Sequence, residues 1–250
     1  MTYETLILSI FKKLGFEPRE HQLSAIDRIL VSFGTGKKNV VLSAPTGSGK
    51  SVIGLVVSEC LRELEPKVDE LGESLKVKLA AYYLTGTIAL TQQYERSFSD
   101  KFGFLEVKSA VNYPCLLMDK GIFDPPDGEQ KSAEHCTRSV LVKKKGTPAE
   151  CSSSLCSYHY MKTNLHEMEH VAMNYSYFFS SSRGHRLAPR LVTVWDEAHL
   201  FNDILCAVQT IEITLKKLDR LKDVFARFNL KTEPISQLKK TLNAEGLNED

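Results

Sequence analysis

The chain has 250 residues, of which 42% are hydrophobic and 25% are charged, an ordinary globular composition that allows one large domain with a full core. Lysine and arginine number 32 against 31 acidic residues, which excludes a protein that attracts nucleic acid or membrane through its net charge alone. The sequence begins with an acid-containing stretch and has no apolar run as long as a membrane span, so we expect an intracellular protein, cytoplasmic or (in a eukaryote) nuclear, with no membrane partner.

Two amphipathic helices are predicted at the start of the chain, the first ended by Gly15 and the second by Gly34. Gln22 lies at the beginning of the second helix, a few residues after the aromatic Phe16. A glutamine amide donates and accepts hydrogen bonds at once, which suits the edge of adenine. We therefore expect Gln22 to contact the base of a nucleotide, and the alternative is an ordinary solvated glutamine on a helix.

The stretch from Ser43 to Ser51, Ser-Ala-Pro-Thr-Gly-Ser-Gly-Lys-Ser, has the pattern of a phosphate-binding loop, with Ala44 where the strict pattern has glycine. A buried strand is predicted over residues 39–42 before it, and an amphipathic helix after it. The glycines let successive N–H groups face the phosphates, Lys50 supplies a positive charge, and the Ser51 hydroxyl suits Mg²⁺. The residues expected to bind ATP are Thr46, Gly47, Ser48, Gly49, Lys50 and Ser51.

A second buried strand is predicted over residues 79–84, after a charged surface loop at 65–78. Thr85-Gly86-Thr87 and then a helix containing Tyr94 follow it. Alternation of strand and helix predicts a parallel sheet covered on both faces. Ligands of such sheets gather at the carboxyl ends of the strands, where the phosphate-binding loop and Thr85-Gly86-Thr87 would both lie.

From about residue 109 to 164 the sequence is rich in proline, glycine and serine and has little periodicity. Soft thiolate ligands suit both zinc and a [4Fe–4S] cluster, and the spacing of the cysteines leaves these two alternatives level. Nearby lysines and tyrosines suit single-stranded DNA, with a solvated charged loop as an equal alternative. Cys60 and Cys206 are interpreted as buried structural thiols. The cysteines predicted to bind a metal are Cys115, Cys136, Cys151 and Cys156.

Regular structure is predicted to return with a strand region over residues 171–179 and a buried strand that ends in Asp196-Glu197. Two acids at a strand end are the usual partner of a phosphate-binding loop. Asp196 would hold Mg²⁺ together with Ser51, and Glu197 would orient and deprotonate the attacking water. The catalytic residues predicted here are therefore Lys50, Asp196 and Glu197.

Residues 44–51 and the Asp-Glu-Ala-His sequence at 196–199 together resemble the DEAH-box helicases of superfamily 2. The cysteine region resembles the iron–sulfur branch typified by the DinG and XPD helicases, through Asn-Tyr-Pro-Cys at 112–115 and a later Asn-Tyr at 174–175. The resemblance covers residues 16 to about 203. It implies an ATP-dependent 5′-to-3′ DNA helicase that binds single-stranded DNA, with a [4Fe–4S] cluster favoured over Zn²⁺.

Two features depart from that family. Lys108-Ser109-Ala110 stands where the family has Lys-Gly-Arg, which leaves the contact of that arginine unfilled. After Asp203, apolar residues at helical spacing over 211–228 predict one long amphipathic helix and a polar tail rather than a second motor domain. A second motor domain, or a second chain acting in trans, is therefore an expected partner.

The expected fold is α/β: a RecA-like P-loop NTPase parallel sheet with a cysteine-rich metal-cluster insertion and a short C-terminal helical segment. In domain terms, the first part of the motor domain occupies residues 1–108 and its second part residues 165–203. The insertion covers 109–164, and the start of a helical, arch-like domain covers 204–250.

Two other functions fit parts of the sequence. A nucleotide-dependent DNA-binding or regulatory module without catalysis is one alternative, because half of a motor is sufficient for binding. The other is a zinc metalloprotease, since His166-Glu167-Met168-Glu169-His170 matches the His-Glu-x-x-His pattern of two imidazoles one helical turn apart.

Overall fold

The computed structural model describes residues 2–64, 80–121, 131–135, 152, 154–182, 187–209, 222–223, 225, 231 and 233–244. The chain divides into two units, Met1–Val208 and Gln209–Asp250. The described part of the second unit includes a helix, α11 (Glu233–Ala244), in which Ile235 is buried. The elements named below belong to the first unit, apart from the last residue of α9.

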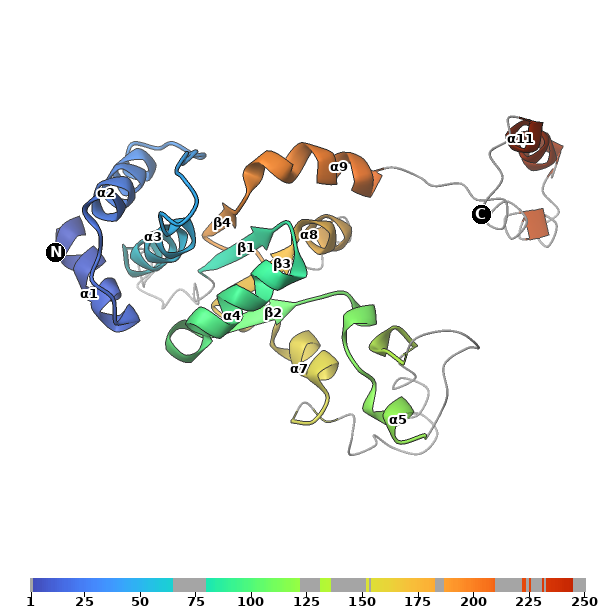
Figure 1. Ribbon diagram of the computed structural model, residues 1–250, viewed down its shortest axis with the longest axis horizontal. Helices are drawn as coiled ribbons and strands as arrows, with labels where there is room; N and C mark the ends of the chain where they lie inside the picture. The colour runs from blue at the N-terminus through green and yellow to red at the C-terminus, as the bar shows by residue number, and fades with distance from the viewer. Residues whose placement is uncertain are drawn as a thin grey trace, which may run out of the picture. The chain divides into compact units, whose positions relative to one another are not determined.

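A four-stranded sheet forms the centre of the first unit, with the strand order β2-β3-β1-β4 and every neighbouring pair parallel (Figure 1). This arrangement confirms the predicted α/β fold and is that of a RecA-like helicase domain. The strands are β1 (Ala81–Thr85), β2 (Phe104–Val107), β3 (His170–Asn174) and β4 (Val192–Trp195).

Helices cover both faces of the sheet, and side chains of β1 alternate between them with the period of two expected of a strand. Ala81 and Tyr83 join the core formed with α1 to α4, whereas Tyr82 and Leu84 join the core that includes residues of α7 and α8. The α-helices of the first unit among the described residues are α1 (Tyr3–Leu14), α2 (Glu20–Gly34), α3 (Lys50–Leu64), α4 (Ile88–Phe102), α5 (Leu116–Asp119), α7 (Ser157–Asn164), α8 (Tyr175–Ser182) and α9 (Phe201–Gln209).

The predicted helices before and after the phosphate-binding loop are confirmed, and their ends have local causes. Thr2 caps α1 by accepting a hydrogen bond from the Thr5 N–H, and Gly15 ends it in the left-handed conformation that glycine adopts easily. Thr87 caps α4 in the same way as Thr2 caps α1, and Gly103 ends it.

The strand predicted over residues 39–42 is wrong, because that segment has no assigned secondary structure. Val41 is 92% exposed, and Val40 and Leu42 are each 36% exposed. The apolar run predicted burial, but β4 is the edge of the sheet and the described residues provide this segment with no strand partner.

The strand region predicted over 171–179 is half correct, because β3 ends at Asn174 and α8 begins at the next residue. Tyrosine and phenylalanine favour strands, but the Asn174 side chain accepts a hydrogen bond from the Tyr177 N–H at 2.8 Å and starts a helix instead. The short strand β2 was not predicted. The predicted loop at 65–78 and most of the predicted helix at 211–228 lie outside the described residues.

A buried polar network fixes the middle and end of α3 against the sheet. Glu59 of α3 lies 2.8 Å from His170 Nε2 of β3, and both residues are at most 2% exposed. Arg62 contacts the Glu59 carboxylate through two nitrogens, at 2.9 and 2.7 Å, and reaches Glu169 at 3.1 Å. The His170 ring also stacks on Phe104, with centroids 4.8 Å apart.

The pKa values of Glu59 and His170 are both lower than the ordinary values of these groups. Burial lowers the pKa of His170, and the contact with Glu59 only partly offsets this effect. Burial alone would raise the pKa of Glu59, but the hydrogen bonds from His170 and Arg62 outweigh it and hold that pKa below its ordinary value. The pair is therefore an ionised glutamate and a neutral histidine whose Nε2–H donates to it.

We predict that the free energy of unfolding falls as the pH drops below about 6.5, the ordinary pKa of histidine. The unfolded chain takes up a proton at His170 there and the folded chain does not, so the loss is at most about 1.4 kcal/mol per pH unit from this group. Glu59 acts in the same direction at lower pH. Urea denaturation at several pH values should give this slope, and His170→Phe should flatten it.

The matched control is His166→Asn, because His166 is exposed. It should leave the slope of stability against pH unchanged. An identical slope in wild type and His170→Phe would contradict the assignment of a neutral buried histidine.

Candidate nucleotide-binding site

The phosphate-binding loop leads directly into α3, which begins at Lys50. Gly47 and Gly49 have φ angles of +79° and +82°, a left-handed conformation that favours glycine and that lets the backbone wrap around an anion. The loop N–H groups therefore lie at the positive end of a helix of 15 residues. Ala44 replaces the first glycine of the strict pattern, and the two left-handed φ angles are kept at Gly47 and Gly49.

The Lys50 side chain turns back into its own loop. Its Nζ donates to the carbonyl oxygens of Ala44 at 3.1 Å and of Pro45 at 3.3 Å. The ammonium group is thereby held against the backbone of its own loop. A phosphate oxygen arriving there would replace two neutral acceptors with a charged one, which forms a stronger hydrogen bond.

Three side chains at the start of α2 contact carbonyl oxygens of the loop. Arg19 Nη1 donates to the Gly47 carbonyl oxygen at 3.1 Å, and His21 Nε2 lies 3.1 Å from the Ser48 carbonyl oxygen. Gln22 Nε2 donates to the same Ser48 oxygen at 3.2 Å, and its Oε1 accepts from the Arg19 N–H at 3.0 Å.

Gln22, predicted to contact adenine, is thus only 6% exposed and has its amide engaged with the loop and the start of α2. Arg19 and His21 were missed because nothing in the sequence marks a contact with a backbone carbonyl. Of the other loop residues, Thr46 is exposed and Ser48 is buried, and within the described part of the chain the Ser48 hydroxyl has no hydrogen-bond partner.

Asp196 follows the last residue of β4 and lies next to Ser51. The Ser51 hydroxyl donates to Asp196 Oδ2 at 3.4 Å, although the residues are 145 positions apart in the sequence. The Tyr94 hydroxyl donates to the same oxygen at 3.0 Å, and the Tyr175 hydroxyl donates to the Asp196 carbonyl oxygen at 2.7 Å. Both tyrosines lie outside the site residues that the sequence predicted.

Glu197 has φ 58° and ψ 43°, and it is the one residue other than glycine with positive φ in the described part of the chain. This conformation is costly for a residue with a Cβ atom, and such outliers concentrate at functional sites. Its side chain is 43% exposed, and its carboxylate lies 3.7 Å from His199 Nε2.

The other predicted ligand-binding segment meets the same end of the sheet. Thr85 ends β1, and its hydroxyl donates to the Thr87 carbonyl oxygen at 2.8 Å. A Cβ atom at Gly86 would lie 2.9 Å from Leu200, so the segment after Glu197 packs directly on this turn. The carboxyl ends of β1 and β4 therefore adjoin, as parallel alternation predicted.

Comparison with known protein families agrees with this geometry. The model of the family described as Type III restriction enzyme, res subunit (ResIII), matches residues 15–230. The chain belongs to the ResIII family. No curated protein matches the chain.

A ResIII domain is a superfamily 2 helicase-like N-terminal motor domain, so this chain is an ATP-dependent helicase-like motor domain. Domains of this kind generally bind nucleic acid, and ATP and Mg²⁺ fit them. The match is to this motor domain in general and not to the iron–sulfur branch. No helix in the described residues combines the length and the apolar character needed to cross a bilayer.

Two of the four predicted cluster cysteines of this ResIII chain can be located. Cys115 is buried and precedes α5, and Cys156 is half-buried and precedes α7. Cys136 and Cys151 lie outside the described residues. Within the residues that are described, no three histidine, cysteine or acidic side chains are grouped to hold a metal. Of the other thiols, Cys60 is buried as predicted, whereas Cys206 is exposed, so that prediction is wrong.

The zinc metalloprotease alternative is wrong on geometry. The pattern requires both imidazoles on one helix, but His166 is an exposed residue in a turn and His170 is the first residue of strand β3. His170 is also completely buried, with its Nε2 on Glu59.

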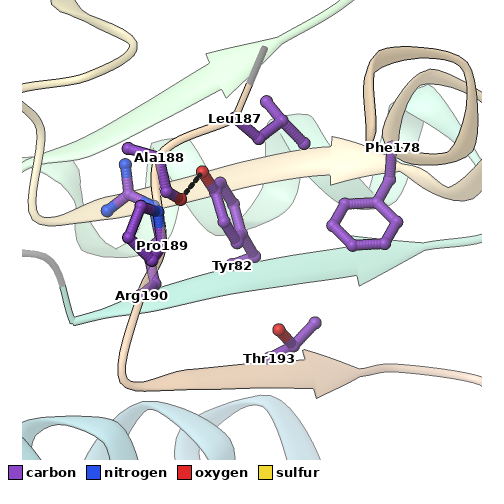
Figure 2. A pocket seen from close by; sticks show the side chains of 7 residues that line it. All are labelled: Tyr82, Phe178, Leu187, Ala188, Pro189, Arg190 and Thr193. Carbon is purple, nitrogen blue, oxygen red and sulfur yellow. Dashed lines mark hydrogen bonds between the residues drawn. The ribbon is translucent and has the colours of Figure 1, made fainter. Parts of the chain in front are cut away.

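A separate pocket of about 280 Å³ lies between residues of β1, α8, β4 and the segment before β4 (Figure 2). Tyr82 of β1 forms one wall, with its hydroxyl donating to the Ala188 carbonyl oxygen at 2.6 Å. The Arg190 guanidinium lies over the Tyr82 ring, 4.5 Å from its centroid. Tyr82 pairs with Thr193 near the amino ends of the strands, so this pocket is at the opposite end from the nucleotide motifs. Its lining residues are Tyr82, Phe178, Leu187, Ala188, Pro189, Arg190 and Thr193.

Proposed function

We propose that this chain is the ATP-binding motor domain of an ATP-dependent 5′-to-3′ DNA helicase. The observation that carries the proposal is the meeting of Ser51 and Asp196, which joins the phosphate-binding loop to the acidic strand end. Two oxygen donors that converge beside a glycine-rich helix start are suited to a nucleotide with its magnesium ion, because Mg²⁺ prefers oxygen ligands.

Each residue has a distinct role in the proposed reaction. The loop N–H groups and Lys50 would neutralise the phosphates, and Ser51 and Asp196 would hold Mg²⁺, which supplies further charge neutralisation when bound. Glu197 would orient the attacking water and accept its proton. Phosphoryl transfer depends mainly on the positions of the reacting groups and on neutralisation of charge. These few groups are therefore enough to form one side of the site that surrounds the nucleotide.

The left-handed conformation of Glu197 favours catalysis over the alternative of a module that only binds nucleotide. A glutamate in that conformation costs about 1 kcal/mol relative to glycine, which would adopt it freely. A binding module gains nothing from a strained carboxylate beside Asp196. A hydrolase gains from the position of that carboxylate.

We also propose that a second nucleotide-facing surface acts together with this one, from a second motor domain or another chain. In motors of superfamily 2 such a surface contributes an arginine that stabilises charge on the transferring phosphate, worth about 10³ to 10⁵ in rate. Movement along single-stranded DNA requires two domains that open and close against each other. The 5′-to-3′ polarity and the choice of DNA follow from the resemblance to the DinG and XPD helicases.

A cysteine-ligated [4Fe–4S] cluster is a further part of the proposal, with Cys115, Cys136, Cys151 and Cys156 as ligands and Zn²⁺ as the alternative. The support is the resemblance to the iron–sulfur branch, together with the preference of such clusters for thiolate ligands.

Lys50→Ala should weaken ATP binding by at least about tenfold, because a charged partner of the phosphates is lost. Binding of a fluorescent ATP analogue with excess Mg²⁺ would measure this. Lys38→Ala is the matched control, since Lys38 is exposed and precedes the loop. Equal affinity in wild type and Lys50→Ala would refute the assignment of the loop.

Glu197→Gln should retain ATP binding and reduce hydrolysis by about 10² to 10⁴, since the size and position of the side chain are kept while the base is removed. Phosphate release under single-turnover conditions is the suitable measurement, because the chain alone is expected to hydrolyse ATP slowly. Equal release by wild type and Glu197→Gln would favour the non-catalytic binding module.

Single-stranded DNA should bind mainly through its phosphates, so its affinity should fall steeply between about 50 and 200 mM salt. Fluorescence anisotropy of a labelled oligonucleotide would measure this. The chain by itself should not unwind a duplex, since one motor face cannot step along a strand. ATP-dependent strand displacement by the purified chain would contradict the need for a second face.

Protein purified without oxygen should be brown, and Cys136→Ser should remove its visible absorption. The matched control is Cys206→Ser, because Cys206 is an exposed cysteine outside the proposed ligand set. Stoichiometric zinc without iron in the oxygen-free preparation would exclude the cluster in favour of the zinc alternative.

A further inference from the structure

Tyr94 is a residue of α4 that belongs to no nucleotide motif and yet contacts one directly. Its hydroxyl donates to Asp196 Oδ2 at 3.0 Å, which is closer than the 3.4 Å contact from Ser51. The residue is only 2% exposed. A buried hydroxyl that donates to a carboxylate makes a stronger hydrogen bond than one between neutral groups.

The Tyr94 ring has little freedom to move. Its centroid lies 5.0 Å from that of Tyr83, 6.0 Å from that of Phe98 and 6.1 Å from that of Phe104. These rings come from β1, α4 itself and β2, so the hydroxyl is fixed relative to the sheet. Such packing holds a donor at one point in space.

The backbone of Asp196 is fixed separately from its side chain. Its N–H donates to the Leu84 carbonyl oxygen at 2.9 Å, and its own carbonyl oxygen accepts from Tyr175 at 2.7 Å. Neither contact determines how the carboxylate is turned, because the last torsion of an aspartate side chain is broad and soft. That rotation is restrained by the hydroxyls of Tyr94 and Ser51.

The hydroxyls of Ser51 and Tyr94 differ in whether they would keep their hydrogen bonds to Asp196 once nucleotide and Mg²⁺ bind. Ser51 is itself a proposed Mg²⁺ ligand, so its contact with Asp196 competes with the metal. Tyr94 has no such second task. A phenol hydroxyl is neutral near pH 7, so the buried Tyr94 side chain donates its hydrogen bond without carrying a charge. A neutral donor orients the carboxylate and leaves its negative charge available to the cation.

We propose that Tyr94 is a positioning residue that holds the Asp196 carboxylate in the orientation that receives Mg²⁺. This inference rests on the proposed function, since it requires Asp196 to be a magnesium ligand. It predicts a defect confined to the metal: loss of the hydroxyl should raise the Mg²⁺ requirement and leave metal-free nucleotide binding unchanged. A purely structural role would weaken both.

The test is Tyr94→Phe in the full chain, which removes one oxygen and keeps the ring within its aromatic packing. Binding of a fluorescent ATP analogue is measured in EDTA and then across a Mg²⁺ titration. We expect an unchanged affinity in EDTA and a half-saturating Mg²⁺ concentration about tenfold higher, the effect of one hydrogen bond to a charged group. An unchanged Mg²⁺ titration, or an equal loss of affinity in EDTA, would overturn the inference.

Two further variants separate this inference from the proposed function. Tyr82→Phe removes another tyrosine hydroxyl of the first unit, the one on Ala188, and should leave the Mg²⁺ titration unchanged; an equal shift in this variant would overturn the inference. Asp196→Asn should raise the Mg²⁺ requirement. If Asp196→Asn has an effect and Tyr94→Phe has none, Tyr94 is not a positioning residue and the proposed function stands. If Asp196→Asn has no effect, both fail.

Discussion

The close approach of α3 to β4 is the constraint on which the candidate nucleotide site depends. Gly54 lies one helical turn after Lys50, and a Cβ atom there would lie 2.9 Å from Cγ1 of Val194, closer than such atoms pack. The missing side chain therefore sets the spacing between helix and strand. Because Ser51 lies on that helix and Asp196 follows that strand, the same spacing brings their oxygens together. Gly54 lies outside both motifs, but a larger residue there would move Ser51 of the phosphate-binding loop away from Asp196.

The far half of α3 is held by a different kind of interaction. Glu59 is bound by His170 of β3 and by Arg62, which continues to Glu169. An ionised carboxylate in a protein interior is tolerated only when its partners compensate for lost hydration, and here they do. Close packing of Gly54 on Val194 therefore positions α3 near the phosphate-binding loop, and the charged contacts of Glu59 position it near its other end. The loop therefore ends in a helix that has little freedom to shift against the sheet.

Sequence patterns predicted the parts of this molecule whose chemistry leaves few choices. A glycine-rich loop of this pattern needs left-handed angles, and Gly47 and Gly49 have them. The same pattern and the acidic pair at positions 196 and 197 marked Lys50, Asp196 and Glu197 as candidate site residues. Alternating strand and helix predicted the parallel sheet. Hydrogen bonds between distant side chains leave no such trace, which is why Tyr94 and Arg19 were missed.

The wrong predictions also have physical causes. An apolar run such as 39–42 predicts burial, but a strand requires a partner for its backbone, and the described residues provide none. Over 171–179 the aromatic residues favoured a strand, and one asparagine side chain at position 174 favoured a helix locally and decided the outcome. The strand β2 was missed because Glu106 interrupts its apolar run, although that glutamate is buried in the structure.

The left-handed backbone at Glu197 has a consequence for how this position tolerates mutation. A change to glycine would relieve the strain, and asparagine enters this conformation more easily than glutamate does. Random substitution acting on stability alone would therefore be expected to replace glutamate at this position. A variant library screened only for folding should therefore accumulate glycine and asparagine at 197, whereas one screened for hydrolysis should keep glutamate.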